Sequence, residues 1–151
     1  MVAISIISVL IGLSYAGYAT FTQRQKLISA GQTLKNTLRD VQSRNFNGEI
    51  DCNVCNCTNP VVDILTGWFV DLSSRQFYGS CQENNFTVTN LNLAADINIA
   101  SNNNIIQFIN DPPRVNSNTV ICLSLLGLSD KYYRINIFRG GDISDSGGLI
   151  S

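Results

Sequence analysis

The sequence predicts an α+β protein in which one long N-terminal helix packs against a C-terminal antiparallel sheet. Three observations predict this fold: an uncharged apolar run at the N-terminus, a helical repeat that continues beyond the run without a proline, and a repeat of two residues from Gly67 onward. At 151 residues, the chain is long enough for one compact domain with an additional element.

The first element is an apolar run, residues 1–23, that contains no Asp, Glu, Lys or Arg. About twenty residues at 1.5 Å each span roughly 30 Å, the thickness of the hydrocarbon core of a bilayer. Three interpretations are open: a cleaved signal peptide, a simple membrane anchor, and an assembly helix that leaves the membrane to pack against copies of itself. No basic residue precedes the run, and its helical pattern continues past the point where a signal peptide ends. Both facts favour the anchor and the assembly helix.

Residues 24–47 are expected to continue this helix with one apolar stripe. The stripe recurs at helical spacing and consists of Leu27, Ala30, Leu34, Leu38 and Val41, with Gly31 beside it. Asn47 and Gly48 form a stop signal, so the helix should end near Phe46, about 65–70 Å from its start. We expect a globular domain to lie on this second half while the first half projects.

Five cysteines follow the apolar run, at Cys52, Cys55, Cys57, Cys81 and Cys122. Their placement suits an oxidising, extracytoplasmic compartment, and their odd number leaves at least one thiol unpaired within the chain. We expect Cys81 to pair with one of the first three and so to fix the connecting loop 48–66 to the strands. Closing a loop of about 25–30 residues contributes about 3–4 kcal/mol. Two interpretations of Cys122 stay open: a buried free thiol, and the partner of a further disulfide.

Residues 67–151 are expected to form the sheet. Alternating apolar residues separated by Asn, Asp, Pro and Gly turns predict strands over 67–72, 77–81, 86–93, 97–99, 105–109, 119–125 and 132–138. The alternation changes phase within 86–93, which predicts a bulge or bend near Asn90. Such short, closely spaced strands indicate a single antiparallel meander, one face of which covers the helix stripe.

Catalytic, cofactor and metal sites are not expected. Histidine is absent, which removes the commonest general base and the commonest zinc ligand. Asp142 and Asp145, between pairs of glycines, could hold calcium, but a solvated flexible terminus is the favoured interpretation. We therefore expect that the protein is not an enzyme.

The charge distribution does not indicate a nucleic-acid-binding protein, because the net charge is −1. One small basic and aromatic cluster near the C-terminus keeps a DNA-binding role open as an alternative: Lys131, Tyr132, Tyr133, Arg134 and Arg139.

Several of these segments together resemble one family. The N-terminal MVAISIISVLIGL resembles the apolar stretch that follows the prepilin peptidase site in type IV pilins and type II secretion pseudopilins. The later pattern is similar to the GspH/FimT-like branch of that family, and it comprises Gly67-Trp68-Phe69-Val70-Asp71, Tyr78, Cys81, Ile135-Asn136-Ile137, Gly140-Gly141 and Gly147-Gly148-Leu149-Ile150.

The resemblance implies the pilin fold and a subunit that polymerises through its helix. The residues expected to pack the filament core are Val2, Ile4, Ile6, Ile7, Val9, Leu10, Ile11, Leu13, Tyr15, Tyr18 and Phe21. Gly12 and Gly17 are either glycines that membrane helices tolerate or positions of close packing or unwinding on assembly. Members of the family also carry a basic leader, a cleavage-site glycine and usually an early acidic residue. We expect this sequence to start a few residues inside that motif.

The predicted function is a structural subunit of a type IV pilus-like extracellular filament. Its implied partners are copies of itself, the inner membrane before assembly, the pilus assembly machinery, and the prepilin peptidase that trims the chain before N-methylation. Two alternatives stay open: a minor pilin or pseudopilin at the filament tip with an adhesive or DNA-binding role, and a membrane-tethered extracytoplasmic binding domain.

Overall fold

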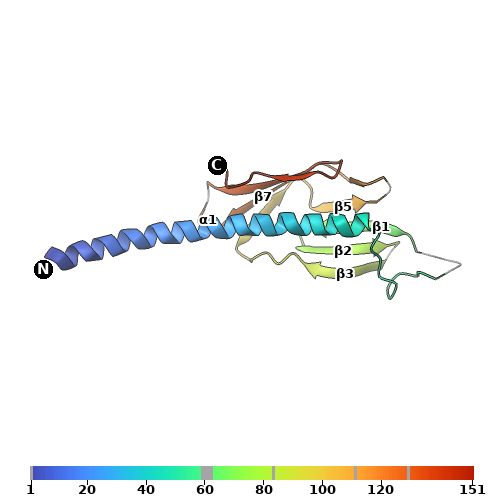
Figure 1. Ribbon diagram of the computed structural model, residues 1–151, viewed down its shortest axis with the longest axis horizontal. Coiled ribbons are helices and arrows are strands. Elements are labelled where there is room, and N and C mark those ends of the chain that lie inside the picture. Colours follow the sequence, from blue (N-terminus) through green and yellow to red (C-terminus); the bar gives the residue numbers. More distant parts are fainter. Residues whose placement is uncertain (1, 59–62, 83, 111, 129) are drawn as a thin grey trace.

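The computed structural model describes residues 2–58, 63–82, 84–110, 112–128 and 130–151, with the side chains of the helix described from Tyr18 onward. Within these residues the chain forms one helix and two antiparallel sheets (Figure 1). The helix, α1 (Val2–Phe46), is continuous over its whole length and ends where the sequence predicts. The predicted α+β class, with an N-terminal helix packed against antiparallel strands, is confirmed.

The strands divide between two sheets. The first sheet has the order β3 (Asn84–Asn90), β2 (Gln76–Cys81), β1 (Leu65–Asp71), β5 (Ile105–Ile109) and β6 (Arg114–Val115). The second sheet has the order β4 (Ile97–Ser101), β7 (Thr119–Leu125), β8 (Tyr132–Ile137) and β9 (Ile143–Asp145). The prediction of a single meander is therefore wrong. After β3 the chain crosses to the second sheet for β4, returns for β5 and β6, and crosses again for β7.

Two local predictions about the strands also need correction. The irregularity expected near Asn90 lies earlier, where β2 and β3 shift register opposite the stretch from Phe86 to Thr89 and Thr87 adopts a φ of 52°. The C-terminal segment is not a flexible tail, because β9 pairs with β8 and Ile150 forms a further bridge to Tyr132. Backbone pairing of this segment replaces the solvation that its glycines and aspartates suggested.

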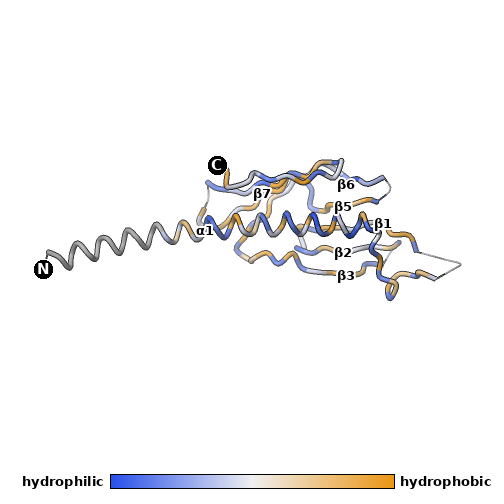
Figure 2. The backbone as a smooth tube through the Cα atoms, in the orientation of Figure 1, coloured by the Kyte–Doolittle hydropathy of each residue, from blue (hydrophilic) through white to orange (hydrophobic). Residues whose placement is uncertain are grey.

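The core lies between the second half of α1 and the inner faces of both sheets. Along this half, hydrophilic and hydrophobic residues alternate turn by turn (Figure 2). The predicted stripe residues Leu27, Leu34, Leu38 and Val41 are fully buried, and Ala30 is packed at its edge. Inward-facing residues of every second strand position complete the core, including Trp68, Val70, Phe108, Ile121, Leu123, Tyr133 and Ile135.

Candidate functional site

The N-terminal part of α1 extends beyond both sheets. In Figure 1 it projects away from the globular part, and the N-terminus lies at the far end of the molecule. Among the helix side chains that the structure describes, which begin at Tyr18, the first fully buried one is Leu27. Before it, Tyr18 is 70% exposed and Phe21 is 57% exposed. The chain therefore carries two large aromatic side chains, both predicted to pack a filament core, that its own sheets do not cover.

The remaining residues of the predicted assembly surface precede these two aromatics. Their side chains lie outside the described part of the structure, and they are Val2, Ile4, Ile6, Ile7, Val9, Leu10, Ile11, Leu13 and Tyr15. The backbone is helical throughout, including at Gly12 and Gly17, so the unwinding expected of these glycines on assembly stays a prediction. Among the residues searched, which are the described ones, no helix is both long enough and apolar enough to cross a membrane.

The packed half of α1 approaches the second sheet closely at Gly31. A Cβ atom at this position would collide with the aromatic ring of Tyr133, which is itself buried. Glycine therefore allows the Tyr133 ring to lie directly against the helix backbone. At Gly31, beside the stripe, the absence of a side chain sets the distance between the helix and the sheet.

A row of polar side chains on α1 binds the C-terminal segment. Lys35 Nζ lies 3.1 Å from Asp145 Oδ2, and the Arg39 guanidinium donates to the Ile143 carbonyl at 3.3 Å. Gln42 Nε2 donates to the Gly141 carbonyl at 2.6 Å. Steps of four and three residues on a helix advance about 6 Å and about 4.5 Å, which is near the 6–7 Å that two residues span in an extended strand. The helix and β9 segment therefore match in spacing, and we call this row of contacts the C-terminal clasp.

Asp145 is the charged centre of the C-terminal clasp. The Tyr133 hydroxyl donates a hydrogen bond to Asp145 Oδ2, and Lys35 contacts the same oxygen. The hydrogen bond from Tyr133 holds the pKa of Asp145 below its ordinary value. Partial burial of the carboxylate opposes this shift, and the charge of Lys35 adds to it. Burial and the bond to Asp145 raise the pKa of Tyr133. The arrangement favours an ionised carboxylate and a neutral phenol at neutral pH.

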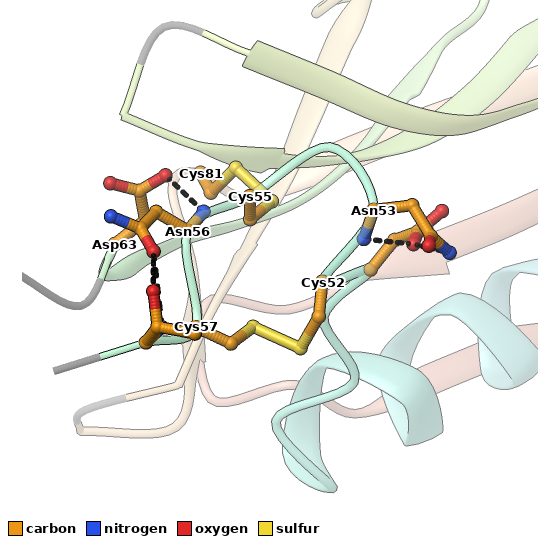
Figure 3. Close-up of a disulfide and its surroundings, with 9 residues drawn as sticks. Cys52, Asn53, Cys55, Asn56, Cys57, Asp63 and Cys81 are labelled. Carbon is orange, nitrogen blue, oxygen red and sulfur yellow. Dashed lines mark hydrogen bonds between the residues drawn. A yellow bond between two sulfur atoms is a disulfide. The ribbon is translucent and has the colours of Figure 1, made fainter.

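Two disulfides organise the loop between α1 and β1 (Figure 3). Cys55 pairs with Cys81 of β2, which confirms the expected bridge from this loop to the strands and selects one of the three partners left open. Cys52 and Cys57 pair with each other across five residues. Cys55 and Cys81 are both buried, so this bridge is part of the core.

Hydrogen bonds fix the same loop to its surroundings. Asn56 and Asp63 are joined twice within the loop. The Asn56 amide donates to the Asp63 carboxylate at 2.7 Å (Figure 3), and the Asp63 amide donates to the Asn56 carbonyl at 2.7 Å. The Trp68 indole donates to the Glu49 carbonyl at 3.1 Å. Arg44 forms ion pairs with Asp40 and Glu49 on the same side, and its guanidinium lies 5.5 Å from the Trp68 ring centroid. The end of the helix, the loop and β1 are thus joined by covalent and polar contacts.

Cys122 is a free thiol. It lies partly exposed in β7 on the outer face of the second sheet, opposite Ala100 of β4 and Arg134 of β8. The buried position that its apolar neighbours suggested is therefore not observed. Strand alternation explains the difference, because Ile121 and Leu123 occupy the inward face.

The basic and aromatic residues near the C-terminus do not form one patch. Arg134 lies over the Tyr132 ring at 5.7 Å on the outer face of β8, while Tyr133 is buried on the inner face. Lys131 precedes β8 and Arg139 follows it, so these two lie at opposite ends of the strand. Among the described residues, no group of three or more Cys, Asp or Glu side chains is placed to hold a metal ion.

The C-terminal clasp is the feature that sequence reasoning missed. The spacing of Lys35, Arg39 and Gln42 places them on one helix face, but that signal does not identify their partners. The partners become apparent only once β9 is recognised as a strand beside α1. Compared with known proteins, the chain matches no protein-family profile, no curated protein and no solved structure.

Proposed function

We propose that this protein is the structural subunit of an extracellular filament of the type IV pilus kind, with the pilin fold, and that it polymerises through its N-terminal helix. One observation carries the proposal: a single 45-residue helix whose N-terminal part projects beyond both sheets, and whose described side chains become buried only from Leu27 onward. A helix of that length extends for about 67 Å. The described aromatic side chains that precede Leu27, Tyr18 and Phe21, are exposed, which supports a role for this part of the helix outside the globular domain.

The composition of the projecting half supports an environment other than water. Residues 1–23 contain no charged side chain, and each exposed Ile, Leu, Val or Phe costs about 1.5–3 kcal/mol relative to burial. Two environments can cover them: the bilayer, and the corresponding helices of other copies. We infer that the chain lies in the inner membrane before assembly and then enters the filament. The prepilin peptidase and the assembly machinery are partners on the strength of the resemblance alone.

A DNA-binding tip subunit is less well supported than a structural subunit. Phosphate recognition requires several basic side chains on one surface, whereas Lys131 and Arg139 lie at opposite ends of β8. Arg134, between them, is engaged with Tyr132. No catalytic role is proposed for any residue of the chain.

The proposal is tested by placing a charge in the projecting helix. We expect Leu10→Lys to reduce filaments in sheared surface material at least tenfold, because a buried ammonium in an apolar bundle has no partner. The matched control is Val120→Lys, which adds the same charge to an exposed position on the outer face of the second sheet. Filaments are counted by electron microscopy and their subunit is identified by mass spectrometry. Retention of both disulfides shows that the globular part of each variant has folded.

Two outcomes contradict the proposal. If Leu10→Lys forms filaments as abundantly as Val120→Lys, the projecting helix does not mediate assembly. If the unmodified chain is found in the membrane fraction but in no filament, it is a tethered extracytoplasmic domain. Trace amounts in filaments built of another protein would make it a minor subunit.

A further inference from the structure

The turn between β7 and β8 carries the most exposed large apolar side chain among the residues that the structure describes. Leu126 is 78% exposed, whereas Leu125 before it and Leu128 after it are buried. The Leu128 amide donates to the Leu125 carbonyl at 3.0 Å, and Gly127 adopts a φ of 96°. Glycine is favoured at the third position of a hydrogen-bonded turn when φ is positive there. The two buried leucines anchor this turn, which holds Leu126 outside the core.

This turn lies beside the point where α1 leaves the globular part. A Cβ atom on Gly127 would lie 3.6 Å from Gln23 Nε2, so the turn lies next to the helix at Gln23. Figure 1 shows the turn after β7 at the end of the globular part from which the helix projects. Gln23 is also the last residue of the charge-free run, and Arg24 follows it. The exposed leucine and the end of the apolar run therefore lie at the same level along the helix.

Other exposed apolar side chains lie near this level. Tyr18 and Phe21 precede Gln23 by five and two residues on the helix itself. The connection between β3 and β4 is held at the helix by Lys26, whose Nζ lies 2.6 Å from Asp96 Oδ2, and the two alanines before Asp96 are exposed. We call these exposed apolar side chains the exit collar, which consists of Tyr18, Phe21, Ala94, Ala95 and Leu126.

The position of the exit collar selects the lipid bilayer as its partner. Residues 2–21 rise about 30 Å as a helix, which matches the hydrocarbon core of a bilayer. When this run spans the bilayer, the residues that follow it lie among the lipid headgroups, and the turn beside Gln23 lies there with them. Apolar and aromatic side chains are favoured at this boundary, where they reach the acyl chains while the backbone stays hydrated. Lipid can therefore cover Leu126, which the protein itself leaves in water.

We propose that the turn between β7 and β8 inserts Leu126 into the boundary between headgroups and acyl chains when the chain lies in the membrane. The inference rests on the proposed membrane location of the projecting helix before assembly. It adds a second contact with lipid, which the globular part makes. Two contacts at separate points fix the tilt of α1 relative to the membrane surface, so the globular part rests on the bilayer in one orientation.

The test uses the full chain in phosphatidylcholine nanodiscs that hold one copy each. Nuclear magnetic resonance records the methyl signals of Leu10, Leu126 and Ile64, with and without lipid that carries a spin label near the headgroup end of an acyl chain. Ile64 is the matched control, because it is 76% exposed but lies in the connection that follows the other end of α1. The label should weaken the Leu126 and Leu10 signals at least fivefold and leave the Ile64 signal unchanged.

Two matched variants test the contact itself. Leu126→Asp and Ile64→Asp each replace an exposed side chain, so neither should lower the melting temperature. Leu126→Asp should reduce the effect of the spin label on the Gly127 amide at least threefold, and Ile64→Asp should leave that effect unchanged. If Leu126→Asp does not fold, Leu126→Ala is measured in its place, with the same expectation.

The outcomes separate this inference from the proposed function. The inference alone is overturned if the label weakens Leu10 but not Leu126, or if the variant at Leu126 leaves the effect on Gly127 unchanged. If the label weakens neither Leu10 nor Leu126, the proposed membrane location fails and the inference fails with it. If Leu126 is free of lipid in the disc and becomes covered only in assembled filaments, its partner is a second copy of the chain, which also overturns the contact with lipid.

Discussion

Removing each disulfide separately should destabilise the protein by different amounts, because the two bridges close loops of different length. The bridge between Cys55 and Cys81 spans 26 residues, and the one between Cys52 and Cys57 spans 5. The chain-entropy relation gives about 3.5 kcal/mol for the longer loop and about 2 kcal/mol for the shorter one. For a chain of this size, each kcal/mol lowers the melting temperature by about 2–4 °C.

The perturbation is a paired substitution that leaves no unpaired thiol at either bridge. Cys55→Ala with Cys81→Ala removes the long-loop bridge, and Cys52→Ala with Cys57→Ala removes the short one as the matched control. Burial strengthens the expected ranking. Cys55 and Cys81 are buried, so their replacement also leaves a small cavity, whereas Cys52 is exposed.

The assay is guanidinium unfolding of the full chain in detergent, followed by tryptophan fluorescence. Trp68 is the only tryptophan in the sequence, it is fully buried, and it donates to the loop carbonyl of Glu49. Its emission should therefore report the loss of packing around both bridges. The reasoning is refuted if the short-loop variant loses as much free energy of unfolding as the long-loop variant, or more.

Two further predictions concern the contact between α1 and the second sheet. Gly31→Ala should lower the free energy of unfolding by about 1–3 kcal/mol despite alanine's better helix propensity, because the added methyl group collides with the buried Tyr133 ring. Thermal unfolding measures this loss. The control is Gly148→Ala, which should change the stability little because a Cβ there meets nothing within 4 Å. Because the pKa of Asp145 is lowered by Tyr133 and Lys35, the stability it contributes should be present above its unfolded pKa of about 3.9 and be lost as the pH falls through its lower folded value. Asp145→Asn should therefore flatten the acid limb of the stability profile measured by urea unfolding, and a limb as steep as that of the unmodified chain would contradict the role of the C-terminal clasp.

The helix could be predicted from the sequence because its signals are local and repeated. The apolar stripe from Leu27 to Val41 keeps one period over four turns, and no proline interrupts it. The glycine after Asn47 then marks the end, and Gly48 indeed adopts a φ of 65°. Strands β5 and β7 were likewise predicted with the bounds they have, because strict alternation lies between clear turn residues in both cases.

The sheet arrangement could not be predicted because strand alternation does not identify neighbours. The residues of β4 alternate as those of β3 do, yet β4 pairs with β7 in the other sheet. The two-residue β6 and three-residue β9 are too short for any period to be visible. The disulfide partner of Cys81 could not be predicted for a similar reason. Three cysteines lie within six residues of one another, and they are equivalent candidates until the path of the loop is known.

The length of α1 separates the projecting segment from the disulfide-bonded loop that follows the helix. Asn45 lies more than six helical turns beyond Phe21, about 36 Å along the axis. Free-energy effects of substitutions more than about 10 Å apart, with no shared partners, are generally additive. The C-terminal clasp lies between these two ends and joins the second half of α1 to the β9 segment of the second sheet, so a change at the C-terminal end of the helix can reach the projecting segment only by loosening such contacts. Removal of the short-loop disulfide beyond the end of α1 and a charge at Leu10 should therefore act independently for as long as the core around Leu34 and Leu38 is intact.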